Sequence, residues 1–205
     1  MQHATSGNRP SRIQVRNRAR ILSAALEVFA AHGFRGATLD QIAEEAGLSK
    51  PNILYYFANK EEIHVTLLGR LMETWLAPMH DIDPEGEPLD EILRYVGRKL
   101  EMSREYPRES RLFANEILQG APRMGPHLQS GLKPLVDRTA SLFERWMEEG
   151  RLARVDPRHL IFSIWATTQH YADFEAQVSV LTEGADSFGG AAQFLDTLYR
   201  RMLTP

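Results

Sequence analysis

The chain contains no cysteine, which excludes disulfides, thiolate catalysis, thiolate metal sites and thiol-based redox sensing. It has no run approaching the ~20 consecutive apolar residues of a membrane span, and no apolar segment follows its basic start as in a signal peptide. We therefore expect a cytoplasmic protein without a membrane partner. No stretch alternates apolar and polar residues for long enough to indicate a strand, so an all-α fold is expected.

Signatures of catalysis are also missing. The sequence has no nucleophile elbow, no phosphate-cradling glycine loop and no paired catalytic acids. His170 and Asp173 stand three residues apart, but two residues do not make a coordination sphere and spacing reveals no third ligand. A polar contact on a helix surface is the preferred interpretation. We expect the chain not to be an enzyme and to hold no metal and no cofactor.

Charge is distributed unevenly along the chain. The 205 residues carry a net charge of −3, yet residues 1–60 hold 8 Lys/Arg against 4 Asp/Glu, and the remainder holds 16 against 23. A basic end on an acidic chain indicates a polyanion partner at that end, although a solubilising tail would have a similar composition. Five arginines precede the first acidic residue: Arg9, Arg12, Arg16, Arg18 and Arg20.

The pattern of residues 38–57 predicts two short helices joined by a tight turn. Apolar residues recur at helical spacing over 39–46, and Gly47 follows, where a left-handed backbone ends a helix at low cost. Ser49 is a suitable N-cap for the second helix, and Pro51 falls in its first turn. This is the layout of a DNA-reading helix-turn-helix, although an ordinary helical hairpin has the same spacing.

The second helix carries side chains suited to nucleic acid. Asn52 can pair with adenine and Lys50 with guanine, and the hydroxyl of Tyr55 or Tyr56 can bond to a phosphate oxygen. Thr38, at the start of the helix pair, can hold a phosphate through its hydroxyl and the free N–H groups there. These residue types favour a DNA reader over a plain hairpin.

The strings GFRGATL (33–39) and LYYFANKEE (54–62) resemble the TetR family of transcriptional regulators, and the resemblance extends over about 17–65. It implies that helix 50–57 is the recognition helix and that Lys60, which opens the next helix, contacts the phosphate backbone. It also implies an N-terminal three-helix DNA-binding domain followed by a helical bundle that binds an effector and forms a homodimer. The candidate DNA-binding residues are Arg16, Thr38, Ser49, Lys50, Pro51, Asn52, Tyr55, Tyr56 and Lys60.

The remaining sequence indicates further helices. Asn59 and Glu62 have capping-box spacing at the start of a helix that runs to about Met79. This helix is the only continuous connection between the basic head and the acidic remainder. Helical patterns also cover about 15–32, where Gly33 ends the helix, and about 89–105, 107–119, 127–149, 157–174 (with Asp156 as its N-cap) and 191–203, which gives about nine helices in all.

A second candidate site lies in the acidic part. Trp165 and Gln169 share one stripe of a predicted helix, and Trp75 in the linking helix offers another indole. Flat apolar walls with a few amides suit a small planar molecule that has a polar edge, because a carboxamide can donate to one group and accept from its neighbour. Two tryptophans in a helical bundle are also common as core anchors, so both interpretations are kept.

The strings WLAP (75–78), KLEMSREYP (99–107) and DPRHLIFSIWATTQHYADF (156–174) resemble the pyrimidine-utilisation regulators within the TetR family. This resemblance implies a homodimer that binds uracil or thymine and then leaves its double-stranded operator DNA. The candidate ligand-binding residues on this basis are Trp75, Phe113, Ile117, Trp165, Gln169 and Tyr171.

The expected function is therefore a repressor of pyrimidine metabolism genes that is released by uracil or thymine. One alternative is a TetR regulator that responds to a different small aromatic or acidic metabolite. Another is a helical enzyme or binding module whose basic head is incidental. The expected domains are a basic flexible arm (1–14), a helix-turn-helix DNA-binding domain (15–60) and an effector-binding and dimerisation domain (61–205).

Overall fold

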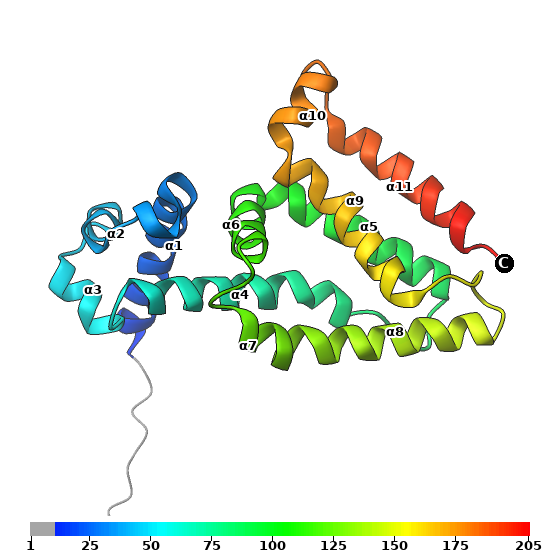
Figure 1. Ribbon diagram of the computed structural model, residues 1–205, viewed down its shortest axis with the longest axis horizontal. Coiled ribbons are helices and arrows are strands. Elements are labelled where there is room, and N and C mark those ends of the chain that lie inside the picture. The colour runs from blue at the N-terminus through cyan, green and yellow to red at the C-terminus, as the bar shows by residue number, and fades with distance from the viewer. Residues whose placement is uncertain (1–10) are drawn as a thin grey trace, which may run out of the picture. The chain divides into compact units, whose positions relative to one another are not determined.

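The computed structural model describes residues 11–205, and all regular secondary structure in that range is helical (Figure 1). The greater part of the arm expected at 1–14 lies outside the described residues. The chain divides into two compact units, Met1–Leu67 and Leu68–Pro205. Between residues 11 and 205, no helix is long and apolar enough to cross a membrane.

The first unit is a helical head built around a small apolar centre. Ile21, Phe29, Ile42, Ile53 and Ile63 are almost fully buried, so each helix of the unit contributes at least one anchor. The stripe predicted over 39–46 is the buried face of the second helix. The helices are α1 (Arg12–Gly36), α2 (Leu39–Ala46), α3 (Lys50–Tyr56) and the start of α4 (Lys60–His80).

The turn between α2 and α3 confirms the predicted helix-turn-helix geometry. Gly47 has φ 58° and ψ 40°, the left-handed conformation that ends α2. A Cβ at this position would meet only the end of the flexible Arg20 side chain, so the left-handed backbone conformation is the reason for glycine here. The Ser49 hydroxyl accepts a hydrogen bond from the Asn52 N–H at 3.3 Å, and Pro51 lies in the first turn of α3.

Helix α1 is longer than the sequence pattern predicts. Ser11 and Gln14 form a capping box that starts the helix before Val15. At the other end Gly33 has φ 64°, which interrupts α1 where the helix was expected to stop, and a further turn follows to Gly36. The predicted capped start of α4 is confirmed, because the Glu62 N–H donates to Asn59 Oδ1 at 2.8 Å.

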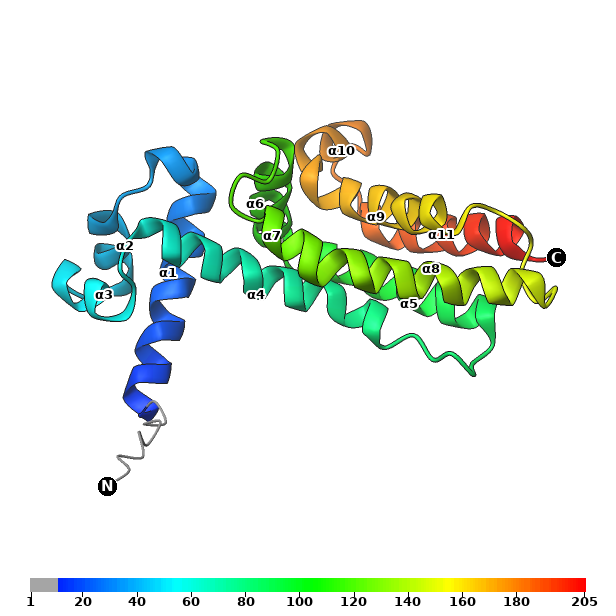
Figure 2. The ribbon, with the colours of Figure 1, turned by 60° about the horizontal axis from the view of Figure 1, so that its bottom comes forward.

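The second unit is a bundle of helices. Helices α5, α9 and α11 run side by side, and α8 packs against α9 (Figures 1 and 2). The last part of α4 also belongs to this unit. The elements after α4 are α5 (Pro88–Glu105), α6 (Pro107–Leu118), α7 (Gly125–His127), the π-helical turn η1 (Leu128–Leu132), α8 (Lys133–Glu148), α9 (Pro157–Asp173), α10 (Glu175–Leu181) and α11 (Ser187–Leu203).

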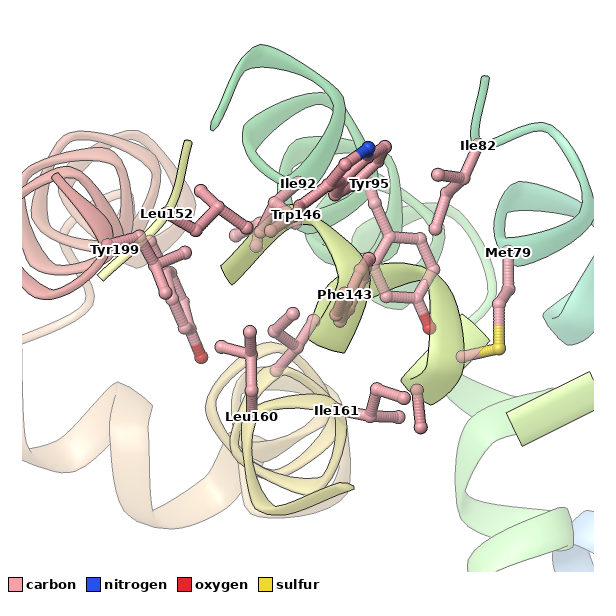
Figure 3. Close-up of a cluster of buried hydrophobic side chains, with 14 of the residues drawn as sticks. Met79, Ile82, Ile92, Tyr95, Phe143, Trp146, Leu152, Leu160, Ile161 and Tyr199 are labelled. Carbon is pink, nitrogen blue, oxygen red and sulfur yellow. The ribbon is translucent and has the colours of Figure 1, made fainter. Parts of the chain in front are cut away.

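Large apolar side chains from four helices form the core of the bundle. Phe143 and Trp146 of α8 stack at a centroid distance of 5.7 Å, and neither is exposed. Figure 3 shows them between Ile92 of α5, Ile161 of α9 and Tyr199 of α11. Burial of this kind stabilises a bundle by roughly 25 cal/mol per Å² of apolar surface removed from water.

Two local elements of the bundle differ from the sequence prediction. Helix α10 was not expected, because its seven residues Glu175–Leu181 are too few to establish a period and none of them is buried. The helix predicted at 127–149 is present, but it contains the π-turn η1. Pro134 explains this turn, since it has no N–H to donate to the carbonyl four residues back; the Lys133 N–H bonds instead to Leu128 O.

Candidate DNA-binding face and effector cavity

Helix α3 presents a polar, exposed face. Pro51, Asn52 and Tyr55 are exposed, and Tyr55 reaches 69% exposure. Lys50 is also exposed, and its ammonium lies 2.9 Å from a carboxylate oxygen of Asp40 on α2. An ion pair between two exposed side chains is weak, so Lys50 can exchange this carboxylate for a phosphate or a base.

Two amides of α1 hold the tyrosines of α3. Gln14 Nε2 donates to the Tyr55 hydroxyl at 3.2 Å, and Asn17 Nδ2 donates to the Tyr56 hydroxyl at 3.0 Å. Each tyrosine therefore acts as an acceptor here and keeps its own O–H free to donate. The sequence pattern did not reveal Gln14 and Asn17, because only the packing of α1 against α3 brings them near.

The arginines of α1 have different surroundings. The Arg18 guanidinium donates to the Tyr56 carbonyl at 2.9 Å and lies 4.1 Å from the centre of the Phe57 ring. It thus supports the end of α3, where backbone carbonyls lack helical partners. Arg16 is exposed and remains available to a polyanion.

Thr38 and Ser49 are both helix caps. The Thr38 hydroxyl accepts from the Gln41 N–H at 3.2 Å and donates to Gln41 Oε1 at 2.9 Å. Because both capacities of this hydroxyl are in use, a phosphate at Thr38 would have to replace the Gln41 side chain. The hydroxyl of Ser49 is used by the cap of α3 but keeps its proton for an outside acceptor.

Lys60 bonds to other parts of the protein, unlike a lysine side chain that is open to a phosphate. Its ammonium donates to the carbonyl oxygens of Phe34 and Ala37, both at 2.7 Å, and lies 4.6 Å from the centre of the Phe34 ring. Two of its three N–H donors are therefore occupied by the end of α1. In this structure Lys60 ties the start of α4 to the end of α1.

The second unit contains a cavity of about 530 Å³ with largely apolar walls. It is bounded by α6, α9 and the π-turn η1, and four of the six expected ligand residues line it. A more open groove of about 590 Å³ elsewhere on this unit has no Phe, Tyr or Trp wall. The residues that line the cavity include Ser110, Arg111, Phe113, Ala114, Ile117, Leu118, Leu128, Leu132, Trp165, Gln169 and Asp173.

Trp165 and Gln169 contribute different chemistry to the cavity. The Trp165 indole N–H donates to the Tyr95 hydroxyl at 2.8 Å, which fixes the ring as a wall. Tyr95 is itself buried, and this burial raises the pKa of its hydroxyl, which therefore stays protonated. The Gln169 side chain makes no hydrogen bond to the described part of the protein, and its amide can both donate to and accept from a ligand.

Asp173 supplies an acceptor at the cavity wall. Its Oδ1 accepts from the Ser110 hydroxyl at 2.6 Å, and burial raises the pKa of this carboxyl. The Asp173 carboxylate also interacts electrostatically with Lys99, a residue that is only 2% exposed. Burial lowers the pKa of Lys99 to about 7, and the Asp173 charge opposes this shift. The wall is therefore backed by a buried lysine side chain.

Trp75 and Tyr171, the other two expected ligand residues, do not line this cavity. Trp75 is buried, its ring centre lies 6.1 Å from that of Tyr106, and Lys99 Nζ lies 5.2 Å from its ring. Its indole N–H has no hydrogen-bond partner within the described chain. Tyr171 packs against Phe188 of α11, with ring centres 5.8 Å apart. Phe113, Ile117, Trp165 and Gln169 do line the cavity.

A DNA-reading head joined to a bundle with an effector-sized cavity is the organisation of a one-component transcriptional regulator, and comparison with known proteins identifies the family. The model for bacterial regulatory proteins of the tetR family matches residues 21–65, and the model for the C-terminal region of YcdC-like proteins matches residues 68–205. The chain belongs to the TetR family of transcriptional regulators, and its relatives and fold are those of DNA-binding regulators rather than enzymes.

The chain is 47% identical over 178 residues to the HTH-type transcriptional regulator RutR of Escherichia coli, which covers 87% of this chain and 84% of that protein. It is thus a RutR homologue. Solved structures share the fold at lower identity. A transcriptional regulator from Streptomyces coelicolor, SCO4942, has a TM-score of 0.74 at 24% identity and covers 91% of this chain and 98% of its own. The ketosteroid regulator KstR2 of Mycobacterium tuberculosis has a TM-score of 0.73 at 19% identity, with 98% and 100% covered.

Proposed function

We propose that this TetR regulator represses pyrimidine metabolism genes and leaves its operator when uracil or thymine occupies the cavity bounded by α6, α9 and η1. The observation that carries the proposal is the juxtaposition of Gln169 and Asp173 on the wall of that cavity. An unengaged carboxamide beside a carboxylate offers both a donor and acceptors, as the alternating C=O and N–H edge of a pyrimidine base requires.

The cavity walls support a small planar effector. Trp165 and Phe113 are aromatic wall residues on α9 and α6, and Ile117 adds apolar surface. Such surfaces favour stacking and hydrophobic contact with a flat ring. A ligand's acidic N–H would donate to Asp173, while its carbonyl oxygen would accept from Gln169.

The head supports recognition of operator DNA by α3. The exposed Asn52 and Lys50 would read base edges in the major groove, while Tyr55, Tyr56, Ser49 and the exposed Arg16 would bond to phosphates. Pro51 and Thr38 contribute through the starts of α3 and α2, where N–H groups point outward. In this proposal Lys60 acts by holding α4 to α1.

The proposal includes a homodimer formed through the last helices. Phe162 of α9 and Phe194 of α11 are 47% and 60% exposed in the single chain. Large exposed aromatic side chains of this kind are common at protein interfaces. Two heads in one dimer would contact successive major grooves of a near-palindromic operator.

One observation favours a second effector class. Arg111 also lines the cavity, although its guanidinium is paired with Glu175 at 2.7 Å. An effector carboxylate could replace Glu175 and form a bidentate pair with Arg111. A small aromatic or acidic metabolite is therefore the alternative effector within the same family.

The test is an anisotropy titration of the protein on a duplex selected from random DNA by the protein itself. We expect uracil or thymine to weaken binding at least tenfold, which requires a preference of ~1.4 kcal/mol for the DNA-incompetent state. Cytosine and benzoate serve as comparison ligands. Release by benzoate but by neither uracil nor thymine would replace the pyrimidine assignment with the acidic alternative.

A further inference from the structure

The π-turn η1 lies between the cavity and helix α4. Leu128 and Leu132, at the two ends of the turn, both line the effector cavity. Between them, Gly131 approaches α4 so closely that a Cβ built on it would stand 3.1 Å from Met72 Cε. One short turn therefore borders the cavity and contacts α4.

The turn has a local cause and room to change. Pro134 cannot donate to the carbonyl of Ser130, so the backbone opens to a bond between Lys133 N and Leu128 O. Single π-turns of this kind occur often at functional positions, since they are less regular than the helix around them. Leu128, Leu132 and Trp165 also border a second groove of about 400 Å³, so space exists around the turn into which its side chains can move.

Met72 is well placed to receive a displacement. It is 8% exposed, and it lies in α4, which runs without interruption from Lys60 to His80. Lys60, at the start of the same helix, is bonded to the carbonyls that end α1. Because α4 is continuous and Lys60 bonds its first turn to α1, a shift of α4 at Met72 would also act on the head.

We propose that the contact between Gly131 and Met72 transmits occupancy of the cavity to α4, with η1 as the moving element. This inference rests on the proposed effector response and adds the residues that couple it to DNA binding. A ligand that presses on Leu128 or Leu132 pushes Gly131 against Met72. Glycine at 131 leaves Met72 undisturbed in the ligand-free arrangement, whereas a Cβ there would stand 3.1 Å from Met72 Cε and displace it by a few tenths of an ångström.

The test compares Gly131→Ala with Gly125→Ala. Both substitutions add one methyl group to the same helical segment, but a Cβ at Gly125 meets nothing within 4 Å, so Gly125→Ala is the matched control. The first measurement uses the ligand-free protein, in which hydrogen–deuterium exchange of residues 60–76 reports on α4. We expect Gly131→Ala to change this exchange at least threefold and Gly125→Ala to leave it unchanged.

The second measurement is operator affinity by anisotropy, with and without uracil, on the duplex selected by the wild-type protein. We expect Gly131→Ala to weaken ligand-free binding at least threefold, as partial occupancy would, and to reduce the further effect of uracil. Adding Met72→Ala should restore the ligand-free affinity by giving the methyl group room. Uracil binding itself, measured by calorimetry without DNA, should become tighter, because the variant already favours the state that uracil prefers.

The two proposals fail in different ways. If Gly131→Ala matches Gly125→Ala in both α4 exchange and operator affinity, the coupling contact is wrong even when uracil releases the wild-type protein. If uracil does not release the wild-type protein but Gly131→Ala still weakens operator binding and Met72→Ala restores it, the contact is supported and the pyrimidine assignment is wrong.

Discussion

Lys60 Nζ lies 2.7 Å from the carbonyl oxygen of Phe34, a residue 26 positions earlier in the chain. The same ammonium bonds to the carbonyl of Ala37, and the Phe34 ring also lies against His64, one turn further along α4, with ring centres 4.8 Å apart. The end of α1 leaves carbonyls without helical partners. Lys60 supplies two of the missing donors, and so joins the DNA-reading head to the helix that leaves it.

The first prediction concerns Lys60→Met, which keeps the length and apolar contacts of the side chain but removes its donors. We expect the free energy of unfolding to fall by about 1–3 kcal/mol, because two carbonyls lose a charged donor. Urea unfolding measures this loss. The slope of log affinity for operator DNA against log salt should stay unchanged.

A change in the salt slope would give Lys60 a different role. A residue that neutralises one phosphate contributes about one unit to that salt slope. If Lys60→Met lowers the slope by about one unit and leaves stability intact, Lys60 is a phosphate contact in the complex, as the family resemblance implies. Lys50→Met is the control, because Lys50 is exposed and, among residues 11–205, bonded only to Asp40.

The second prediction compares a residue that lines the cavity with one on the same helix that does not. Gln169→Leu keeps the volume of the side chain but removes its donor and acceptor, so we expect uracil affinity to fall about tenfold, or ~1.4 kcal/mol. Tyr171→Phe should leave it unchanged, since Tyr171 packs against Phe188 and does not line the cavity. Calorimetric titration of uracil measures both. Equal losses for the two variants would mean that the ligand binds elsewhere.

The third prediction is a pH dependence set by Lys99. Burial lowers the pKa of Lys99 from 10.5 to about 7. Between these values the unfolded state binds more protons than the folded state, so the free energy of unfolding should rise with pH from about 7 upward, by at most ~1.4 kcal/mol per pH unit. Below about pH 7 this contribution is constant.

Lys99→Met provides the comparison for this effect. The variant should be more stable than the wild type near neutral pH, because a buried cation is replaced by an apolar side chain of similar size. Its stability should lack the rise above pH 7. Urea unfolding at about pH 6, 7.5 and 9 measures both curves. Parallel curves for the two proteins would show that Lys99 keeps its ordinary pKa.

The fourth prediction tests the dimer surface. Phe194→Asp places a charge on an aromatic position of α11 that is 60% exposed in the single chain, and we expect it to convert the dimer to a monomer at micromolar concentration. Light scattering after gel filtration measures the mass. Val15→Asp, on an exposed position of α1, is the control and should remain dimeric. A dimeric Phe194→Asp protein would mean that the subunits pair through another face.

The sequence predicts the fold well where structure is local. Gly47, Ser49 and the cap of α9 at Asp156 have conformations that neighbouring residues determine, and each takes the predicted role. The all-helical class follows from apolar periodicity alone. Helix α10 and the π-turn were missed for opposite reasons. The first has too short a pattern, and the second is a change of register caused by Pro134 inside an otherwise regular pattern.

The candidate sites depend on packing, which a single sequence constrains less. The stripe containing Trp165 and Gln169 could be read from helical spacing, and both residues line one cavity. Whether Trp75 and Tyr171 also faced it depended on helix rotations that spacing does not determine. Lys99 and Asp173 were missed as a pair, because 74 residues separate them and a lysine is rarely buried.

The cavity and the core use largely separate residues. The core is made by α5, α8, α9 and α11 around Phe143 and Trp146, whereas Phe113, Ala114 and Ile117 of α6 line the cavity without belonging to that core. Substitutions on α6 can therefore reshape the chemical preference of the regulator at little cost to folding. That division offers a route by which one scaffold acquires sensors for unrelated metabolites, and it marks α6 as the place to begin when engineering a new response.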